Sequence, residues 1–548
     1  MLFGGAHVDG ARRNGMKRWN GWGDEYVDFP MDEAGLSYLE SVLGPGTRPQ
    51  DATFEEVIHR VPLPRLPNHR LILTDADERL RHARGQSFPD WLALRSGRVS
   101  SFPDGVAHPA TENEVRELIS FCSDGEFRLI PYGGGTSVVG HINPPEKCGP
   151  VLTLAMDHMR GLLSLDKVSL LATFQTGVRG PDLESQLRAQ SLTLGHFPQS
   201  FEYSTLGGWV VTRSSGQQAL RYGGIRELFS GGRLETPLGT MELPLFPTSA
   251  AGPDLRELVL GSEGRLGILT KATVRVRALP ERERFFGLIF PHWDGAFEAV
   301  REMAQAGLQL SMMRLQDRSE TRTSLLFGGN PKVTAILERY LAIRGAKEGK
   351  CLAILGCTGT AHSCSAVQRE AVRVARRHDG LWLGQAAGSA WLKSRFLAPY
   401  LRNTLWEAGY GVDTMETSMP WSRLPAALET VRSGLERALD TEGERTLTMA
   451  HLSRFYPDGA SLYVTCLFRL ANDPDQTMER WRLLKRAASL ALTQAGGTIS
   501  HQHGVGTDHT PYLVAEKGAL GLAALAGAIH ALDPAGTMNP GKLLPKME

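Results

Sequence analysis

The stretch that most constrains the fold is 131–142, PYGGGTSVVGHI, in which three consecutive glycines precede Thr136 and Ser137. It follows the largely apolar run 127–130, as expected for a strand that runs into a turn. Glycines let backbone amides approach a phosphate closely, and the two hydroxyls add donors. Taken alone, the pattern leaves a structural turn and a phosphate loop equally open. The candidate ligand contacts here are Pro131, Gly133, Gly134, Gly135, Thr136, Ser137 and Gly140.

Two further clusters of glycines and hydroxyls follow, at 198–216, PQSFEYSTLGGWVVTRSSG, and at 261–268, GSEGRLGI. Three such loops in one domain suit a long, diphosphate-bearing ligand better than a single phosphate. The spacing matches neither G-x-G-x-x-G at the start of a helix nor G-x-x-x-x-G-K-[ST], which excludes a Rossmann fold and a P-loop. The added candidate contacts are Pro198, Ser204, Thr205, Gly207, Gly208, Thr212, Ser215, Gly216, Glu263, Gly264, Gly267 and Ile268.

At these loops the chain resembles the FAD-binding domain of the vanillyl-alcohol-oxidase type. The resemblance implies an α+β fold in which FAD lies extended between two subdomains, with an α+β cap domain and a C-terminal segment that returns to the flavin site. The narrower family resemblance, which four further motifs carry, implies that FAD is held without a covalent bond. His141, directly after the glycine loop, is the alternative, because some relatives tether FAD through a histidine.

Four more motifs narrow the resemblance: RWNGWG at 18–23, ETSMPWSR at 416–423, YPDGASLY at 456–463 and SHQHGVG at 500–506. In this order they are similar to the alkyldihydroxyacetonephosphate synthase (alkylglycerone-phosphate synthase) family. The resemblance implies an FAD-dependent transferase of ether lipid biosynthesis. Its reaction exchanges the acyl group of acyl-dihydroxyacetone phosphate for a fatty alcohol through a flavin N5 adduct, with no net transfer of electrons.

The same resemblance assigns the site residues. Tyr463 falls at the family's catalytic tyrosine, Arg402 at a phosphate-binding arginine and Arg314 at a second arginine near the active site. Histidine suits acid–base work near neutral pH, so His501 and His503 are catalytic candidates together with Gln502. If this segment is extended, both imidazoles point to one side and Gln502 to the other.

The chain departs from the family pattern twice. Gln502 stands within what is commonly a run of three histidines, and Arg454 stands where a histidine is common. Because an amide cannot act as a base, two alternatives stay open. One is an FAD-dependent oxidase or dehydrogenase of a 2-hydroxy acid or alcohol, in which His503 is the base and Arg402 binds a carboxylate. The other is a catalytically silent FAD-binding protein.

The chain of 548 residues is long enough for more than one folding unit. We expect an N-terminal region of helices and loops (1–100), an FAD-binding domain (101–280), a substrate-covering cap domain (281–495) and a C-terminal segment (496–548). Residues 1–15 are rich in glycine and arginine, and the family pattern starts near Met16, so Met1 and Met16 are both candidates for the native start.

Composition limits the partners. A formal net charge of +1 gives no reason to expect nucleic acid. The closest cysteines, Cys351, Cys357 and Cys364, lack CxxC spacing, so we expect reduced thiols and no metal site. The longest apolar run, 519–532, has the length of a core helix, and no signal peptide or terminal Ser-Lys-Leu is present. We therefore expect a cytoplasmic enzyme of lipid substrates that can touch a membrane surface, and the resemblance implies a homodimer.

Overall fold

The computed structural model describes residues 16–327 and 331–545, so residues 1–15, on which the choice between Met1 and Met16 depends, lie outside the described part. The N-terminal region holds the helices α1 (Glu33–Leu43), α2 (Phe54–Ile58), α3 (Ala76–Arg81) and α4 (Phe88–Arg95). Helix α2 begins with a capping box, in which Thr53 and Glu56 exchange hydrogen bonds with each other's backbone. This region also supplies one short strand to the first sheet.

The first sheet has the order β1-β2-β4-β3, with β1 (Ile72–Leu73), β2 (Gly105–Ala107), β3 (Arg128–Tyr132) and β4 (Val151–Ala155). Strands β2, β4 and β3 run parallel, and β1 pairs antiparallel to β2 at the edge. Every residue of β2 and β4 is buried, as expected for central parallel strands. Helix α5 (Glu112–Asp124) lies between β2 and β3 in the chain, and β3 runs directly into the glycine loop.

The second sheet is antiparallel, in the order β5-β6-β10-β8-β9. Its strands are β5 (Leu162–Asp166), β6 (Leu171–Gln175), β8 (Phe229–Thr236), β9 (Gly239–Leu243) and β10 (Ile268–Arg275). The helices of this part are α6 (Gly180–Arg188), α7 (Leu206–Val211), α8 (Ala219–Tyr222), α9 (Ile225–Leu228) and α10 (Arg256–Val259), and β7 (Leu192–Thr193) pairs with β11 (Arg277–Ala278). Together the two sheets form the α+β architecture that the resemblance to the vanillyl-alcohol-oxidase type implies.

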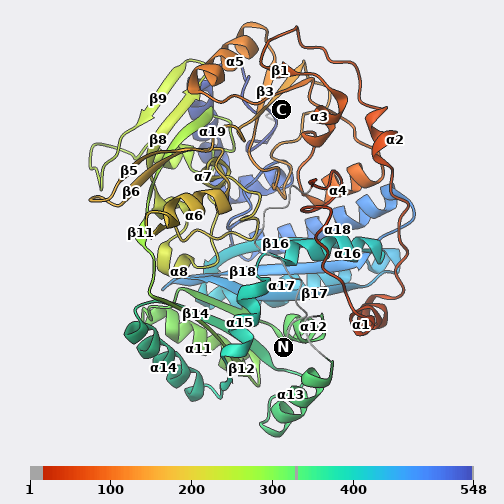
Figure 1. Cartoon of the computed structure of the whole chain (residues 1–548). Coiled ribbons are helices and arrows are strands. Elements are labelled where there is room, and N and C mark those ends of the chain that lie inside the picture. Colours follow the sequence, from red (N-terminus) through yellow and green to blue (C-terminus); the bar gives the residue numbers. More distant parts are fainter. Residues whose placement is uncertain (1–15, 328–330, 546–548) are drawn as a thin grey trace.

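The third sheet has seven antiparallel strands in the order β15-β12-β14-β13-β17-β18-β16, and Figure 1 shows it below the two smaller sheets. Its strands are β12 (Arg282–Phe290), β13 (Met312–Gln316), β14 (Cys351–Gly359), β15 (Leu381–Gly384), β16 (Tyr410–Pro420), β17 (Thr446–Phe455) and β18 (Gly459–Arg469). The helices are α11 (Trp293–Gln305), α12 (Arg318–Phe327), α13 (Pro331–Ile343), α14 (Ala361–Arg377), α15 (Gln385–Ser394), α16 (Leu401–Glu407), α17 (Leu424–Arg437) and α18 (Pro474–Gln494).

After α18 the chain returns to the first two sheets. Residues 537–539 pair with Leu129 of β3, whose amide donates to the Thr537 carbonyl (2.9 Å) and whose carbonyl accepts from the Asn539 amide (2.8 Å). Asn539 Nδ2 also donates to the carbonyl of Glu263 (2.7 Å), in the third glycine loop. The C-terminal segment is thus anchored beside the loops, as the resemblance implies.

Helix α19 (Leu513–Leu532) differs from the expected core helix. By length and composition, 510–532 is apolar enough to cross a membrane, yet only 17% of its most apolar window is buried. The helix lies beside the second sheet (Figure 1) and contributes Ile529 to the core there. Its exposed residues are mostly alanine and glycine together with Val514 and Leu520, and they include the charged Glu516 and Lys517. The high apolar content of this helix therefore does not correspond to burial, because only one narrow side of the helix packs against the rest of the protein.

Candidate active site

One cavity of about 870 Å³ is lined by the glycine loops, by β16, β17 and β18 of the third sheet and by part of the 500–506 turn. Of the residues predicted to bind a cofactor, all except Gly140 line this cavity. Gly140 has a left-handed φ of 77°, and a side chain there would overlap Thr507. It therefore lets the chain turn against the C-terminal segment and does not contact the cavity.

The three glycine loops meet because two glycines lack a side chain. A Cβ at Gly134 would overlap the carbonyl of Tyr203 in the second loop, and one at Gly264 would overlap Pro131 of the first.

Gln217 and Asn539 line the same cavity, and each has a buried side-chain oxygen without a hydrogen-bond partner among the described residues. Such atoms are normally satisfied, so they point to a polar ligand. The volume falls at the upper end of the range of ligand pockets, roughly 300–1,000 Å³.

The 500–506 turn is held by two buried glutamates from different parts of the chain. Glu416 Oε1, on β16, accepts the amides of Gln502 (2.6 Å) and His503 (2.7 Å). The carboxylate of Glu263, in the third glycine loop, accepts the amides of Val505 (2.5 Å) and Gly506 (2.9 Å). Two anchors of this kind force a bend, and they bring Gln502 and His503 to the cavity together.

His501 does not line the cavity, contrary to its predicted place beside His503. Its Nε2 lies 2.8 Å from the hydroxyl of Tyr456, and burial lowers the pKa of its imidazole. The alternation expected of an extended segment fails because residues 501–503 form a bend. Gln502 and His503, rather than the two histidines, are the pair that faces the ligand space.

Tyr463 lies on β18, directly opposite His451 of β17 and Glu416 of β16. Its ring stacks on the ring of His451, with centroids 4.8 Å apart, and meets the ring of His503 edge-on at 5.6 Å. Burial raises the pKa of Tyr463 above its ordinary value, so the phenol stays protonated at neutral pH. It can therefore act as a hydrogen-bond or proton donor.

Arg314, on β13, belongs to a network with Glu320 and His451, two residues that were not among the predicted site residues. Its Nη2 donates to Glu320 Oε1 (2.6 Å), and Glu320 Oε2 lies 2.8 Å from His451 Nδ1. All three side chains line the cavity. Burial acts to raise the pKa of Glu320, but His451 and Arg314 together lower it to about 2. The carboxylate therefore stays charged and fixes the orientation of the His451 ring.

His451 is a possible proton acceptor. Burial, followed by the charge of Arg314, lowers its pKa, so the imidazole is neutral at pH 7. When Nδ1–H points to Glu320, Nε2 is left unprotonated. His451 could have been found from the sequence, because side chains of a strand alternate between two faces. This alternation places His451 and Ser453 of β17 on one face, and both line the cavity. The partner Glu320 is distant in sequence, and no local pattern identifies it.

Arg402, on α16, lines the cavity and forms no ion pair with any described residue. Its guanidinium stacks over the ring of Trp91 at 4.4 Å, and Nη1 donates to the carbonyl of Gln86 (2.7 Å). Burial lowers its pKa to about 10, which leaves it charged. A desolvated cation without a carboxylate partner fits an anionic group of a ligand.

Arg454, at the second departure from the family pattern, also lines the cavity. Its Nη2 lies 4.0 Å from Glu227 Oε2, and its guanidinium lies over the ring of Tyr456 at 5.6 Å. Where the family commonly has the titratable ring of a histidine, this chain thus has the permanent positive charge of an arginine.

A different part of the cavity wall is apolar. It comprises Phe29, Phe327, Leu401, Leu405, Val412, Met449 and Leu467. These side chains belong to or pack on one hydrophobic cluster between α1, α16 and the third sheet, apart from Phe29. The cavity therefore combines glycine loops, a group of polar side chains and an apolar wall within one space.

Comparisons with known proteins agree with this arrangement. Residues 103–243 match the family model described as FAD binding domain, and residues 279–543 match FAD linked oxidases, C-terminal domain. The alkyldihydroxyacetonephosphate synthase of Dictyostelium discoideum is 30% identical over 96% of this chain and 86% of its own length. A solved alkyldihydroxyacetonephosphate synthase superposes with a TM-score of 0.81 at 26% identity, covering 96% of this chain and 99% of that one.

The fold is that of the vanillyl-alcohol-oxidase type. Substrate-bound p-cresol methylhydroxylase superposes with a TM-score of 0.66 over 90% of this chain and 98% of its own, at 12% identity. The cofactor of the domain is FAD, and the glycine loops with their unpartnered polar atoms fit a ligand of that length and polarity. Fold, cavity and sequence relatives agree: the chain belongs to the alkyldihydroxyacetonephosphate synthase family of FAD-dependent enzymes.

Proposed function

We propose that this enzyme exchanges the acyl group of acyl-dihydroxyacetone phosphate for a fatty alcohol, a step of ether lipid biosynthesis. The observation that carries the proposal is one cavity lined both by Arg402, which has no carboxylate partner, and by an apolar group that includes Leu405 and Met449. A phosphorylated lipid needs both features. A small 2-hydroxy acid has no long chain for the apolar wall to bind.

The three glycine loops would hold FAD, with the hydroxyls of Thr136, Ser137 and Ser215 available to its phosphates. When bound, the flavin supplies an electrophilic centre for the substitution. The protein's own task is to place the substrate, to exclude water and to move protons at defined atoms.

Substrate placement follows from charge and polarity. Arg402 would take the phosphate, because its planar guanidinium matches two phosphate oxygens. The apolar wall, from Phe29 and Phe327 to Leu467, would take the fatty chain and exclude water from the reacting atoms. This arrangement leaves the reacting carbon near the polar group around Tyr463.

Proton transfer would involve three side chains. The neutral imidazole of His451 and the imidazole of His503 flank Tyr463 and can each accept a proton from the substrate carbon or from the incoming alcohol. The protonated phenol of Tyr463 would donate a hydrogen bond to the carboxylate that leaves. Glu320 and Glu416 would position His451 and the 500–506 turn, respectively.

The test is anaerobic spectroscopy of the yellow holoprotein. Palmitoyl-dihydroxyacetone phosphate is added first and hexadecanol second, and the lipid product is analysed by mass spectrometry. We expect the oxidised-flavin absorbance to fall, then to return together with an alkyl ether product. Bleaching that persists would instead indicate net reduction and a redox enzyme. An unchanged spectrum without ether product would reject the proposal.

Replacing Gln502 with histidine should raise kcat by roughly tenfold above pH 6.5, because an imidazole can accept a proton where an amide cannot. Gln502 already lines the cavity beside His503, so the new ring would face the substrate. The measurement is the pH profile of kcat for the wild type, Gln502→His and the control Gln502→Asn, which keeps the amide. An identical profile for all three would show that position 502 takes no part in proton transfer.

We also expect FAD to be released when the protein is precipitated with acid, leaving a colourless pellet and a yellow supernatant. His141 lines the cavity, but its Nδ1 lies 2.8 Å from Ser137 Oγ and its Nε2 lies 3.0 Å from Glu263 Oε1. Nδ1 is thus held by a hydrogen bond, whereas Nε2 lies near the Glu263 carboxylate without hydrogen-bond geometry. Colour that remains in the pellet, and is lost in His141→Ala, would contradict this prediction.

We also propose that the enzyme is a cytoplasmic homodimer that contacts a membrane surface. Lipid substrates call for contact with a membrane surface, and the exposed apolar face of α19, with Val514 and Leu520, supports such contact. All six cysteines are free, which suits the reducing cytoplasm. The family resemblance supports a homodimer.

A further inference from the structure

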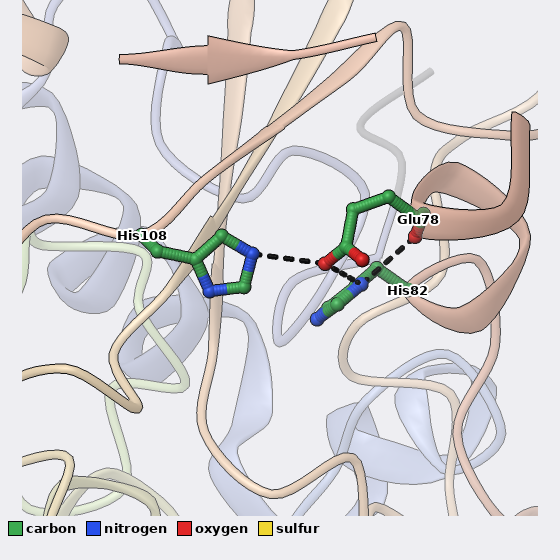
Figure 2. Close-up of side chains that lie close together, drawn as sticks. All are labelled: Glu78, His82 and His108. Atoms are coloured by element: carbon green, nitrogen blue, oxygen red, sulfur yellow. Dashed lines mark hydrogen bonds and ion pairs between the residues drawn. The ribbon is translucent and has the colours of Figure 1, made fainter. Parts of the chain in front are cut away.

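A second group of polar side chains lies outside the cavity, where α3 meets the first sheet. Glu78 is on α3, His82 is its C-terminal cap and His108 directly follows β2. Figure 2 shows the two imidazoles turned toward one carboxylate, with Glu78 Oε1 2.9 Å from His108 Nε2 and 3.2 Å from His82 Nδ1. All three side chains are only partly exposed, and their ligand atoms lie within 4.8 Å of one another.

Asp157, which follows β4, supports this group from the other side. Its Oδ1 lies 2.7 Å from His108 Nδ1, so the second nitrogen of that ring is held by a carboxylate. His108 therefore lies between two carboxylates, with Asp157 at Nδ1 and Glu78 at Nε2.

We propose that Glu78, His82 and His108 bind a divalent transition-metal ion, for which zinc is the best match. Two imidazoles and one carboxylate are a common zinc donor set, with a water as fourth ligand. At the usual bond lengths, the ligand atoms of a tetrahedral site lie roughly 3.3 Å apart, which is close to the spacing around Glu78 Oε1. His82 Nδ1 would exchange its contact with the backbone carbonyl of Glu78 (2.9 Å) for the metal bond.

Asp157 would then be a positioning residue. A metal-bound histidine normally donates its other N–H to a carboxylate, which orients the ring. The contact of His108 Nδ1 with Asp157 has this geometry. The spacing of the cysteines predicts no metal site, whereas these three ligands come from separate elements that only the fold brings together.

The site would connect the N-terminal helices to the glycine loop. The ring of His82 packs on the ring of Tyr132, with centroids 4.5 Å apart, and Tyr132 immediately precedes the three glycines and lines the cavity. A bound ion would hold α3, β2 and the start of this loop in one arrangement. We therefore expect the metal to raise the melting temperature of the holoprotein without being required by the reaction.

The test uses the full-length holoprotein, stripped with a chelator and then dialysed against zinc. We expect about one zinc per chain by elemental analysis and a higher melting temperature. Co²⁺ in place of zinc should give ligand-field bands at longer wavelengths than the flavin absorbance. His82→Ala and Glu78→Gln should lose stoichiometric binding, and Asp157→Asn should weaken it by roughly 10- to 100-fold.

His158→Ala is the matched control. His158 is exposed beside His108, with ring centroids 5.3 Å apart, and His108, Asp157 and His158 form the competing group of three. Retention of zinc by His158→Ala supports the proposal. No zinc on the wild type, or zinc that survives His82→Ala and Glu78→Gln, would overturn it. Flavin absorbance and the melting curve of each stripped variant identify any that failed to fold, and the two ligand variants are independent of each other.

Discussion

Replacing Tyr463 with phenylalanine should lower kcat by a factor of roughly 10²–10⁴ while the protein stays yellow. The phenol is the protonated donor of the site, because burial raises its pKa, and it lies between the rings of His451 and His503. Phenylalanine keeps the ring and its packing and removes only the hydroxyl. The measurement is the steady-state rate of ether formation together with the flavin content of the variant.

Tyr456→Phe is the control for this prediction. Tyr456 also contacts a histidine of the 500–506 turn, since its hydroxyl lies 2.8 Å from His501 Nε2, but it does not line the cavity. The same deletion of a hydroxyl should therefore leave kcat within a few-fold of the wild type. Equal losses in both variants would mean that the hydroxyls hold the fold of the site; no loss in Tyr463→Phe would remove the phenol from the mechanism.

Arg402→Ala should lower kcat/KM for palmitoyl-dihydroxyacetone phosphate by about 100-fold, mainly through KM. A charge-assisted contact contributes about 1.5–3 kcal/mol, and two parallel contacts from one guanidinium add geometric specificity. Arg402 lines the cavity without a carboxylate partner, and this is what assigns the phosphate to it. The apparent affinity for hexadecanol, which has no phosphate, should stay unchanged.

Two further variants separate charge from packing at this position. Arg402→Met keeps an apolar stem against Trp91 and loses the charge, so its KM should rise as much as in Arg402→Ala. Arg402→Lys keeps the charge but not the fork, and its KM should fall between those of the wild type and Arg402→Ala. An unchanged KM for the phosphorylated substrate in Arg402→Met would place the phosphate elsewhere.

Features that depend on local chemistry could be predicted from the sequence. The apolar run 127–130 predicts a strand before the glycine loop, and β3 (Arg128–Tyr132) is that strand. The glycine loops line one cavity as expected, because turns and close backbone approach need glycine wherever they occur. Strand formation and tight turns depend on residues that are neighbours in the chain, so they can be predicted from one sequence.

Contacts between distant residues were decided by the tertiary structure. Glu416 and Glu263 bend the 500–506 turn from two sides, which sends His501 to Tyr456 and brings Gln502 into the cavity. Strand register places His451 against Tyr463, and Glu320 reaches His451 from another element. No local sequence pattern predicts these contacts.

The sequence by itself thus determined the glycine loops, the α+β fold class and the family. The tertiary structure decided which polar side chains share the cavity, that Glu78, His82 and His108 converge, and that the apolar helix α19 lies largely exposed. The physical reason is the same in each case. Backbone propensity and turn chemistry act over a few residues, whereas hydrogen-bond partners and burial depend on which elements pack together.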